Sequence, residues 1–256
     1  MLLIILPWFS SAIIDASVLK GMDMDRETQA VWCLSKINVF RELPRALIGR
    51  LAKITSHKEY SKGELIFGPY DAEERIFVIR EGEVEIYQLS MEGKKVIIDI
   101  LVPGNIFGNS SFVADGDVSS DDFAMARSRV ILCVFKKSEF MNILSRMPQL
   151  ALSLIGEISK KLNEADSRIR DLALSDATAR LIGELMRFGK KTGKEIDNKI
   201  IIGTKLTHEE LAELTGVTRE TVTRVLKKLR QDKIVDLDQS RHFVIDKDKV
   251  EATLNL

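Results

Sequence analysis

Between residues 59 and 136, apolar and polar side chains alternate in short runs that are separated by turn residues. RIFVIREGEVEIYQ (75–88) predicts two strands around the pair Glu81-Gly82, because glycine can adopt the positive φ of a tight turn. Several short strands at such spacing predict an antiparallel β-roll, similar to a jelly roll. Further predicted elements are strands at 94–101 and 130–137 and a covering helix at 43–54.

A different pattern follows, in which apolar residues recur at alternating steps of four and three from Ala151 onward. A seam of this kind over three heptads predicts one long helix that pairs with the same helix of a second chain in a coiled coil. The alternative is an amphipathic helix that lies on its own domain. The expected dimer contacts are Ile155, Ile158, Leu162, Ala165, Ile169 and Leu172.

Residues 206–231, LTHEELAELTGVTRETVTRVLKKLRQ, predict two short helices joined by a tight turn. Thr207 with Glu210 three residues later is the capping-box pattern, and Thr218 can cap the second helix. Gly216 can make the turn between them, which gives a helix-turn-helix unit. The buried contact between the two helices is predicted at Leu211, Ala212, Val222 and Val225.

The outward face of the second helix carries Arg219, Glu220 and Arg224. A major groove admits a helix of this kind; Arg can donate two hydrogen bonds to guanine, and Glu can accept one from the cytosine amino group. The alternative is a solvated helix with pairs such as Glu220–Arg224, which leaves the turn and the threonines unexplained. Hydroxyl contacts to phosphates are expected from Thr207, Thr218, Thr221 and Thr223.

Two flanking segments complete this C-terminal part. Ser175-Asp176 predicts the start of a preceding helix, which we expect to end at Gly189 and the polar run that follows it. KIVDLDQSRHFVIDKD (233–248) predicts two strands, the wing of a winged helix. Arg241 and His242 at its tip can reach the DNA backbone; alternatively, the hairpin only covers the core.

Composition narrows the choice of function. The 256 residues suffice for two domains, and 38 basic against 38 acidic residues mean that only a local patch can support nucleic-acid binding. Two cysteines and three scattered histidines offer no metal site, and sparse cysteine fits a reducing cytoplasm. The apolar start MLLIILPWFSSAII is too short to span a membrane and lacks the basic residues of a secretory signal. We interpret it as a mis-assigned start, with Met22 or Met24 as the first residue, or as a short arm that packs on the body.

The order of a β-roll, a long helix and a winged helix resembles the Crp/Fnr family of bacterial transcription regulators. The resemblance covers residues 30–253, and its strongest motif is TRETVTRVLKKL (218–229), with REGEVEIY (80–87) and PGNIFG (103–108) in support. It implies that Arg219, Glu220 and Arg224 read a GTGA-like half-site. It also implies that a homodimer binds an inverted repeat.

The effector cup that the resemblance implies is where this chain departs from cyclic-AMP-binding members. Those members follow PGNIFG with a Gly-Glu pair and later an Arg-Ser pair for the cyclic phosphate, whereas Gly108 here precedes Asn109 and the later pair is Ser119-Ser120. The charge-assisted contact to the phosphate is thereby lost. Ala165-Asp166 stand where the Thr-Ser pair for adenine is expected. The candidate effector residues are Gly108, Asn109, Ser110, Ser119, Ser120, Lys161 and Asp166.

We therefore expect that this chain does not bind cyclic AMP. The sequence lacks the four cysteines that the iron–sulfur-binding members of the family need. It also offers no axial haem ligand with a supporting partner residue. A different small ligand in the same cup, or none, stays open. So does a redox switch between Cys33 and Cys133, against which Cys133 lies in an apolar strand where a structural thiol is usual.

These patterns predict an α+β chain with four parts: an N-terminal extension (1–29), a sensor β-roll (30–148), a dimerisation helix (149–174) and a winged-helix domain (175–256). The predicted function is that of a cytoplasmic, dimeric, sequence-specific DNA-binding regulator that contacts RNA polymerase if it activates transcription. The alternative is a ligand-sensing module that acts through protein partners. No membrane partner is expected, and no nucleophile–base pair, metal set or phosphate-binding glycine loop points to an enzyme.

Overall fold

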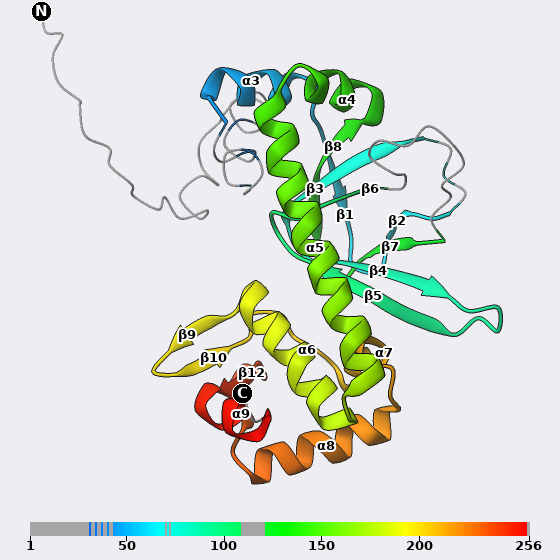
Figure 1. Cartoon of the computed structure of the whole chain (residues 1–256). Helices are drawn as coiled ribbons and strands as arrows, with labels where there is room; N and C mark the ends of the chain where they lie inside the picture. Colours follow the sequence, from blue (N-terminus) through cyan, green and yellow to red (C-terminus); the bar gives the residue numbers. More distant parts are fainter. Residues whose placement is uncertain are drawn as a thin grey trace, which may run out of the picture.

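The chain forms a β-roll, one long helix and a C-terminal helical unit with a small sheet of its own (Figure 1). The computed structural model describes residues 31, 34, 37, 40, 43–69, 71, 73–108 and 121–254. The N-terminal extension, on which the expectation of a mis-assigned start or a packed arm falls, lies outside the described residues. Within the described part, no helix has both the length and the apolar character needed to cross a bilayer.

The predicted order of elements is confirmed. The β-roll and its covering helices consist of α3 (Arg45–Lys53), β1 (Ser56–Tyr60), β2 (Leu65–Phe67), β3 (Arg75–Glu81), β4 (Val84–Leu89), β5 (Lys95–Leu101), β6 (Ile106–Gly108), β7 (Phe123–Ala126), β8 (Val130–Lys136) and α4 (Lys137–Ser145). The long helix α5 (Pro148–Leu174) follows. The C-terminal unit consists of α6 (Ala177–Thr192), β9 (Lys194–Ile196), β10 (Lys199–Ile201), α7 (His208–Thr215), α8 (Arg219–Gln231), β11 (Val235–Leu237), β12 (Phe243–Asp246) and α9 (Lys247–Leu254).

Two four-stranded antiparallel sheets make up the β-roll, with strand orders β1-β8-β3-β6 and β2-β7-β4-β5. Stacked rings of Phe67, Phe77 and Phe107 lie in the core that these strands share, and the Phe77 and Phe107 centroids are 5.1 Å apart. The turn between β3 and β4 needs Gly82, which has φ +85°. A Cβ there would lie 2.2 Å from the carbonyl oxygen of Arg129. The turn of β3–β4 is thus pressed against the turn of β7–β8.

The outer side of the first sheet is covered by α3, α4 and the first turns of α5. Phe135 of β8 packs there against Phe40 and Phe140, with ring centroids 6.5 and 5.4 Å apart. Cys133 belongs to the same cluster and is fully buried, which fits a structural thiol. Cys33, its partner in the redox hypothesis, lies outside the described residues.

Helix α5 begins with Pro148, where a missing N–H leaves no helical hydrogen bond unmade. Leu150 and Leu154 are buried on the β-roll, and beyond them the large apolar residues of the seam are exposed to between 50% and 65%. These exposed residues are Ile155, Ile158, Leu162, Ile169 and Leu172. A contiguous apolar face left open within one chain is typical of a helix that pairs with a partner. The pairing itself stays a prediction.

A cluster of charges joins α5 to α6 just before the C-terminal unit. Glu184 of α6 is fully buried, and its carboxylate accepts hydrogen bonds from Arg168 of α5 at 3.1 Å and from Arg187 at 2.8 Å. Arg187 also donates to Asp171 of α5 at 2.7 Å, and Arg168 donates to the carbonyl of Ile98 in β5 at 2.7 Å. The cluster therefore ties α5, the C-terminal unit and the β-roll together.

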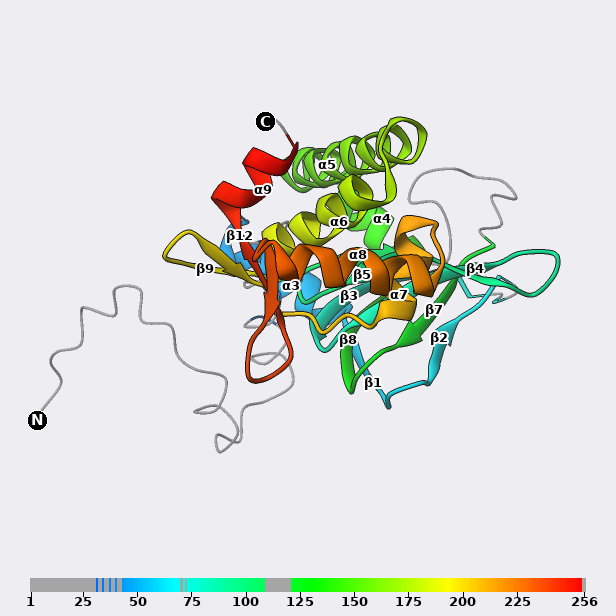
Figure 2. The ribbon, with the colours of Figure 1, turned by 90° about the horizontal axis from the view of Figure 1, so that it is seen from below.

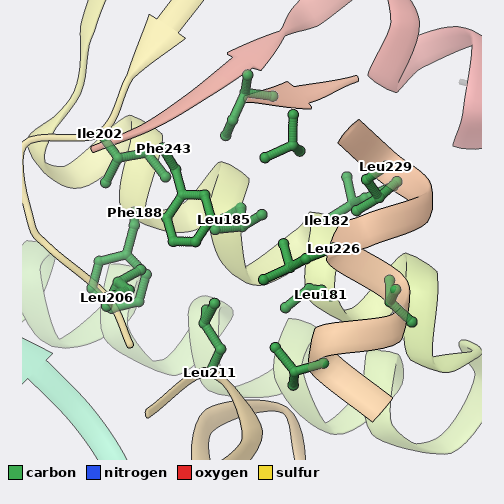
Figure 3. Packing of buried hydrophobic residues seen from close by; sticks show 14 of the residues in the cluster. Leu181, Ile182, Leu185, Phe188, Ile202, Leu206, Leu211, Leu226, Leu229 and Phe243 are labelled. Carbon is green, nitrogen blue, oxygen red and sulfur yellow. The ribbon is translucent and has the colours of Figure 1, made fainter. Parts of the chain in front are cut away.

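The C-terminal unit packs α6, α7 and α8 against a sheet with strand order β11-β12-β10-β9. Figure 3 shows its core, in which Leu185 and Phe188 of α6 lie close to Leu211 of α7 and Leu226 of α8. As predicted, Asp176 caps α6, its side chain accepting from the backbone N–H of Ala179 at 2.8 Å.

Helix α6 ends within the polar run after Gly189, as expected, but the rest of that run is not a loop. The helix runs to Thr192, and β9 and β10 form a hairpin from the polar run. Asp197 and Asn198 have φ values of 44° and 64°, as the two central residues of a type I′ turn require. The pair lacks the glycine that signals such turns, and the strands have only three residues each, so the pattern was too short to predict.

Strand β5 carries an irregularity that links the two halves of the chain. Ile86 of β4 pairs with Asp99 and Tyr87 pairs with Ile97, so Ile98 is the extra residue of a β-bulge. Because of this bulge, Ile97 and Ile100, three residues apart, both enter the core of the C-terminal unit. α7 contacts β5 at this place, so the C-terminal unit is docked on the β-roll.

Candidate nucleic-acid interface

Helix α7 begins with the capping box that the sequence predicts. The backbone N–H of Glu210 donates to Thr207 Oγ1 at 3.1 Å, and the N–H of Thr207 donates to Glu210 Oε2 at 2.7 Å. Partial burial alone raises the pKa of Glu210, but the Thr207 hydrogen bonds and the Arg127 guanidinium outweigh it and lower the pKa. The carboxylate therefore stays ionised as it caps the helix, an arrangement worth about 1 kcal/mol.

The turn between α7 and α8 depends on Gly216. It has φ +66°, the left-handed conformation that closes a helix, and the next N–H, of Val217, donates to Ala212 O at 3.2 Å. Thr218 then caps α8 by accepting from the N–H of Thr221 at 3.2 Å. Behind the turn, Leu211, Ala212, Val222 and Val225 are all buried, as the sequence predicts.

The outward face of α8 is exposed along its length. Arg219, Glu220 and Arg224 are all exposed, and Lys227 extends the same face by one turn after Thr223 and Arg224. Arg224 has no hydrogen-bond or ion-pair partner among the described residues, while Arg219 lies 3.9 Å from Glu209 Oε2. A hydrogen bond from its own backbone N–H lowers the pKa of Glu220, with help from Thr218, so this acceptor is ionised.

The threonine hydroxyls have partners within the unit. Thr218 Oγ1 donates to Thr221 Oγ1 at 3.1 Å. Thr223 Oγ1 donates to the carbonyl of Arg219 at 2.9 Å and lies 2.9 Å from Nδ1 of His208. These hydroxyls therefore hold the start of α8 in place, and phosphate contacts from them remain a prediction.

The wing is formed by β11 and β12, and its tip is ordered by Asp238. The carboxylate of Asp238 accepts from the N–H of His242 at 2.8 Å, and this bond is the main cause of its lowered pKa. Arg241 sits at the tip with φ +65° and is exposed. Of the two predicted wing contacts, Arg241 is the one free to point outward, because His242 is half-buried beside Asp238.

The arrangement of these parts is visible in two views. Figure 1 shows α8 at the lower end of the molecule, the end at which α5 also finishes. Figure 2, seen from below, shows α8 and the β11–β12 hairpin in front of the β-roll. The exposed face of α8, with Arg219, Glu220 and Arg224, is therefore not covered by any described part of its own chain.

A cavity of about 610 Å³ lies between the β-roll, α5 and the helix-turn-helix unit. Apolar residues such as Phe107, Ile86 and Leu172 line much of it, together with the candidates Gly108 and Lys161. Lys161 Nζ donates to the carbonyl of Ile106 at 3.3 Å, and desolvation lowers its pKa. The volume of the cavity is in the range of small-molecule sites.

The other effector candidates are placed differently. Ala165 lines this cavity, whereas Asp166 is exposed and is not among the described lining residues. The remaining four, Asn109, Ser110, Ser119 and Ser120, lie outside the described residues. The described part of the chain also contains no cluster of histidine, cysteine and carboxylate residues that could hold a metal ion.

Two features of this region were missed at the sequence level. Lys227 could have been found, because it lies three and four residues after two members of the exposed face of α8. Arg127 could not: it lies in the turn after β7 and binds Glu210 of α7, 83 residues away, at 2.5 Å. Only the folded chain brings those two together.

Two family models match the chain. A model of the cyclic nucleotide-binding domain matches residues 57–147, and one of the Crp-like helix-turn-helix domain matches residues 179–253. The global nitrogen regulator of Synechococcus elongatus is 29% identical over 214 residues, which cover 83% of this chain and 93% of the relative. The CRP-like cAMP-activated global transcriptional regulator of Mycobacterium tuberculosis is 20% identical over 217 residues, or 85% of this chain and 96% of the relative.

Solved structures share the fold. A mutant of CooA from Carboxydothermus hydrogenoformans matches with a TM-score of 0.67 and 23% identity, over 83% of this chain and 91% of that chain. FixK2 from Bradyrhizobium japonicum matches with a TM-score of 0.66 and 20% identity, over 78% and 96%. At these identities the likeness speaks for the fold alone.

Proposed function

Because this chain belongs to the Crp/Fnr family of transcription regulators, we propose that it is a cytoplasmic homodimer that binds an inverted-repeat DNA site. The observation that carries the proposal is the placement of α8. Its exposed basic face lies at the end of the molecule where the open seam of α5 also ends (Figure 1). Pairing of two α5 helices along that seam would put two α8 helices at one end of the dimer.

The chemistry of the face suits base reading. Arg219 and Arg224 can each form two hydrogen bonds with guanine, and the ionised Glu220 can accept from a cytosine amino group. α7 begins beside α8, and its N-terminal N–H groups suit a phosphate, as in other helix-turn-helix units. Two such units in one dimer would read half-sites about 34 Å apart, one turn of the duplex.

The test is selection of bound duplexes from a random pool by the full-length protein. The expected product is a motif with two identical half-sites related by a dyad and centred about 10 base pairs apart. Enrichment of a single asymmetric site, or none, would overturn the proposal. Glu220→Gln is a useful companion, because it should alter the preference at one base pair per half-site while the spacing stays the same.

For the effector, we propose a small molecule other than cyclic AMP in the cavity beside α5. In support, Nε of Arg168 and of Arg180 are buried atoms at this cavity without a hydrogen-bond partner among the described residues. The sequence argues against cyclic AMP itself, because Asn109 follows Gly108 and Ser119-Ser120 stand in place of the Arg-Ser pair for the cyclic phosphate. We expect 1 mM cyclic AMP to leave the thermal midpoint unchanged; a saturable rise would refute this part alone.

A further inference from the structure

Arg127 makes several polar contacts between the β-roll and the C-terminal unit. Its guanidinium donates to Glu83 Oε2 within the β-roll at 2.6 Å. It also donates to Glu210 Oε1 of α7, from Nη2 at 2.5 Å and from Nε at 3.1 Å, and to the carbonyl of Lys205 at 3.0 Å. One planar side chain thus holds two carboxylates and a carbonyl from two different domains, which suits the fixed fork of donors in arginine.

The contact is extended by a second bond across the same boundary. Thr204, which is buried, donates its hydroxyl to Glu83 Oε1 at 2.7 Å. Glu83 itself is fixed, because its N–H donates to Ser128 Oγ at 3.1 Å. Glu83 therefore joins Arg127 to the segment that leads into α7, and the two turns of the β-roll act as one support.

The pair of Arg127 and Glu210 is largely shielded from water. The side chain of Arg127 is only 11% exposed and that of Glu210 19%, so water competes weakly for the pair. Beside it, Ile97 and Ile100 of β5 lie in the core of the DNA-binding unit. On the same strand, Asp99 accepts a hydrogen bond from Lys191 of α6 at 3.0 Å. Apolar and ionic contacts thus together hold the C-terminal unit on the β-roll.

The docked orientation is one in which the DNA-reading face is open. α8 contacts α7, α7 contacts β5 of the β-roll, and α8 lies at the lower end of the molecule, beyond α7 (Figure 1). Glu210 keeps its capping bonds to Thr207 while it binds Arg127, so the contact reaches the start of α7 directly.

We propose that Arg127 is a positioning residue for DNA binding, which fastens α7 to the β-roll in the orientation that presents α8 to the duplex. The inference rests on the proposed DNA-binding function. Without this contact the C-terminal unit would sample other orientations, and DNA would have to select the competent one from a smaller population.

The test is Arg127→Gln, compared with Arg129→Gln as the matched control. Arg129 lies two residues away in the same turn but pairs with Glu59 on the β-roll, and both side chains are more than half exposed. We expect Arg127→Gln to weaken binding to the selected site about tenfold, a typical size for coupling between two sites. Arg129→Gln should bind like the wild type. Equal or tighter binding by Arg127→Gln would refute the inference; tighter binding would mean that the docked state is inhibitory.

Two further readouts separate positioning from direct DNA contact and from misfolding. A lost phosphate contact would reduce the slope of log affinity against log salt by about one, whereas a positioning residue leaves the slope unchanged. In the absence of DNA, hydrogen–deuterium exchange in α7 and in residues 202–206 should be faster in Arg127→Gln than in the wild type. The β-roll core should stay protected in both proteins. If wild-type protein selects no site but exchange still rises, the proposed function fails and the contact between domains stands.

A double-mutant cycle locates the partner. Glu210→Gln keeps the capping geometry, since Gln can replace Glu in a capping box, but it removes the charge that Arg127 binds. The two changes together should weaken DNA binding no more than Arg127→Gln alone. Additive losses would place the effect of Arg127 elsewhere and overturn this assignment.

Discussion

Leu162→Ala is the sharpest test of the proposed dimer, because Leu162 is 60% exposed at the middle of the α5 seam. The change removes three carbons, about 2.4 kcal/mol of transfer free energy at about 0.8 kcal/mol per methylene, if the whole side chain is buried by pairing. Scaled by the exposed 60%, this is about 1.4 kcal/mol per chain. Two copies give about 3 kcal/mol, or roughly a hundredfold increase in the dimer dissociation constant.

Leu174→Ala is the control for that experiment. Leu174 is 80% exposed, so it loses the same carbons from a more open position, but it lies off the seam that starts at Ala151. Sedimentation equilibrium over a range of concentrations measures both constants. The reasoning is refuted if Leu162→Ala dimerises within threefold of the wild type, or if both variants weaken the dimer equally.

Further outcomes follow from the same geometry. Arg224→Ala should weaken binding to the selected site by about 1–3 kcal/mol and relax one base position, whereas Lys227→Ala should weaken all duplexes alike, as anisotropy titrations with matched and scrambled sites would show. Gly216→Ala, at φ +66°, should lower the free energy of unfolding in urea by about 1–2 kcal/mol. Gly49→Ala should raise it by about 0.5–1 kcal/mol, because Gly49 lies in α3 with open space where the added Cβ would be. Desolvation and neighbouring carboxylates raise the pKa of Glu213, so the folded state holds this proton more tightly and stability falls as pH rises through that pKa. Glu213→Gln should therefore melt above the wild type at pH 8, and the difference should vanish near pH 3.

Local signals in the sequence predicted most of what is local in the fold. The caps at Thr207 and Thr218, the turn at Gly216 and the wing strands each depend on a few adjacent residues, and all lie where expected. The β9–β10 hairpin was missed because its turn, Asp197-Asn198, lacks glycine. Short strands with unusual turns leave too little pattern for a prediction.

What could not be predicted depends on pairing between distant segments. The alternation in KKVIIDIL indicates a strand but gives no sign that Ile98 is bulged, because a bulge is a property of the pairing with β4. Yet this bulge places Ile97 and Ile100 in the core of a domain that begins 75 residues later. The contact between Arg127 and Glu210 depends in turn on that docking.

Helix α5 links these separate features into one mechanism. Its outer seam is exposed, as the proposed dimer requires, while Arg168 and Asp171 on the same helix bind α6 through Glu184 and Arg187. A ligand beside α5 would border Arg168, so it could change how α6 is held without touching α8. Such a ligand can shift the orientation of α8 only by its difference in affinity between the docked and released states. The contact at Arg127 opposes release, so its strength sets how large that difference must be.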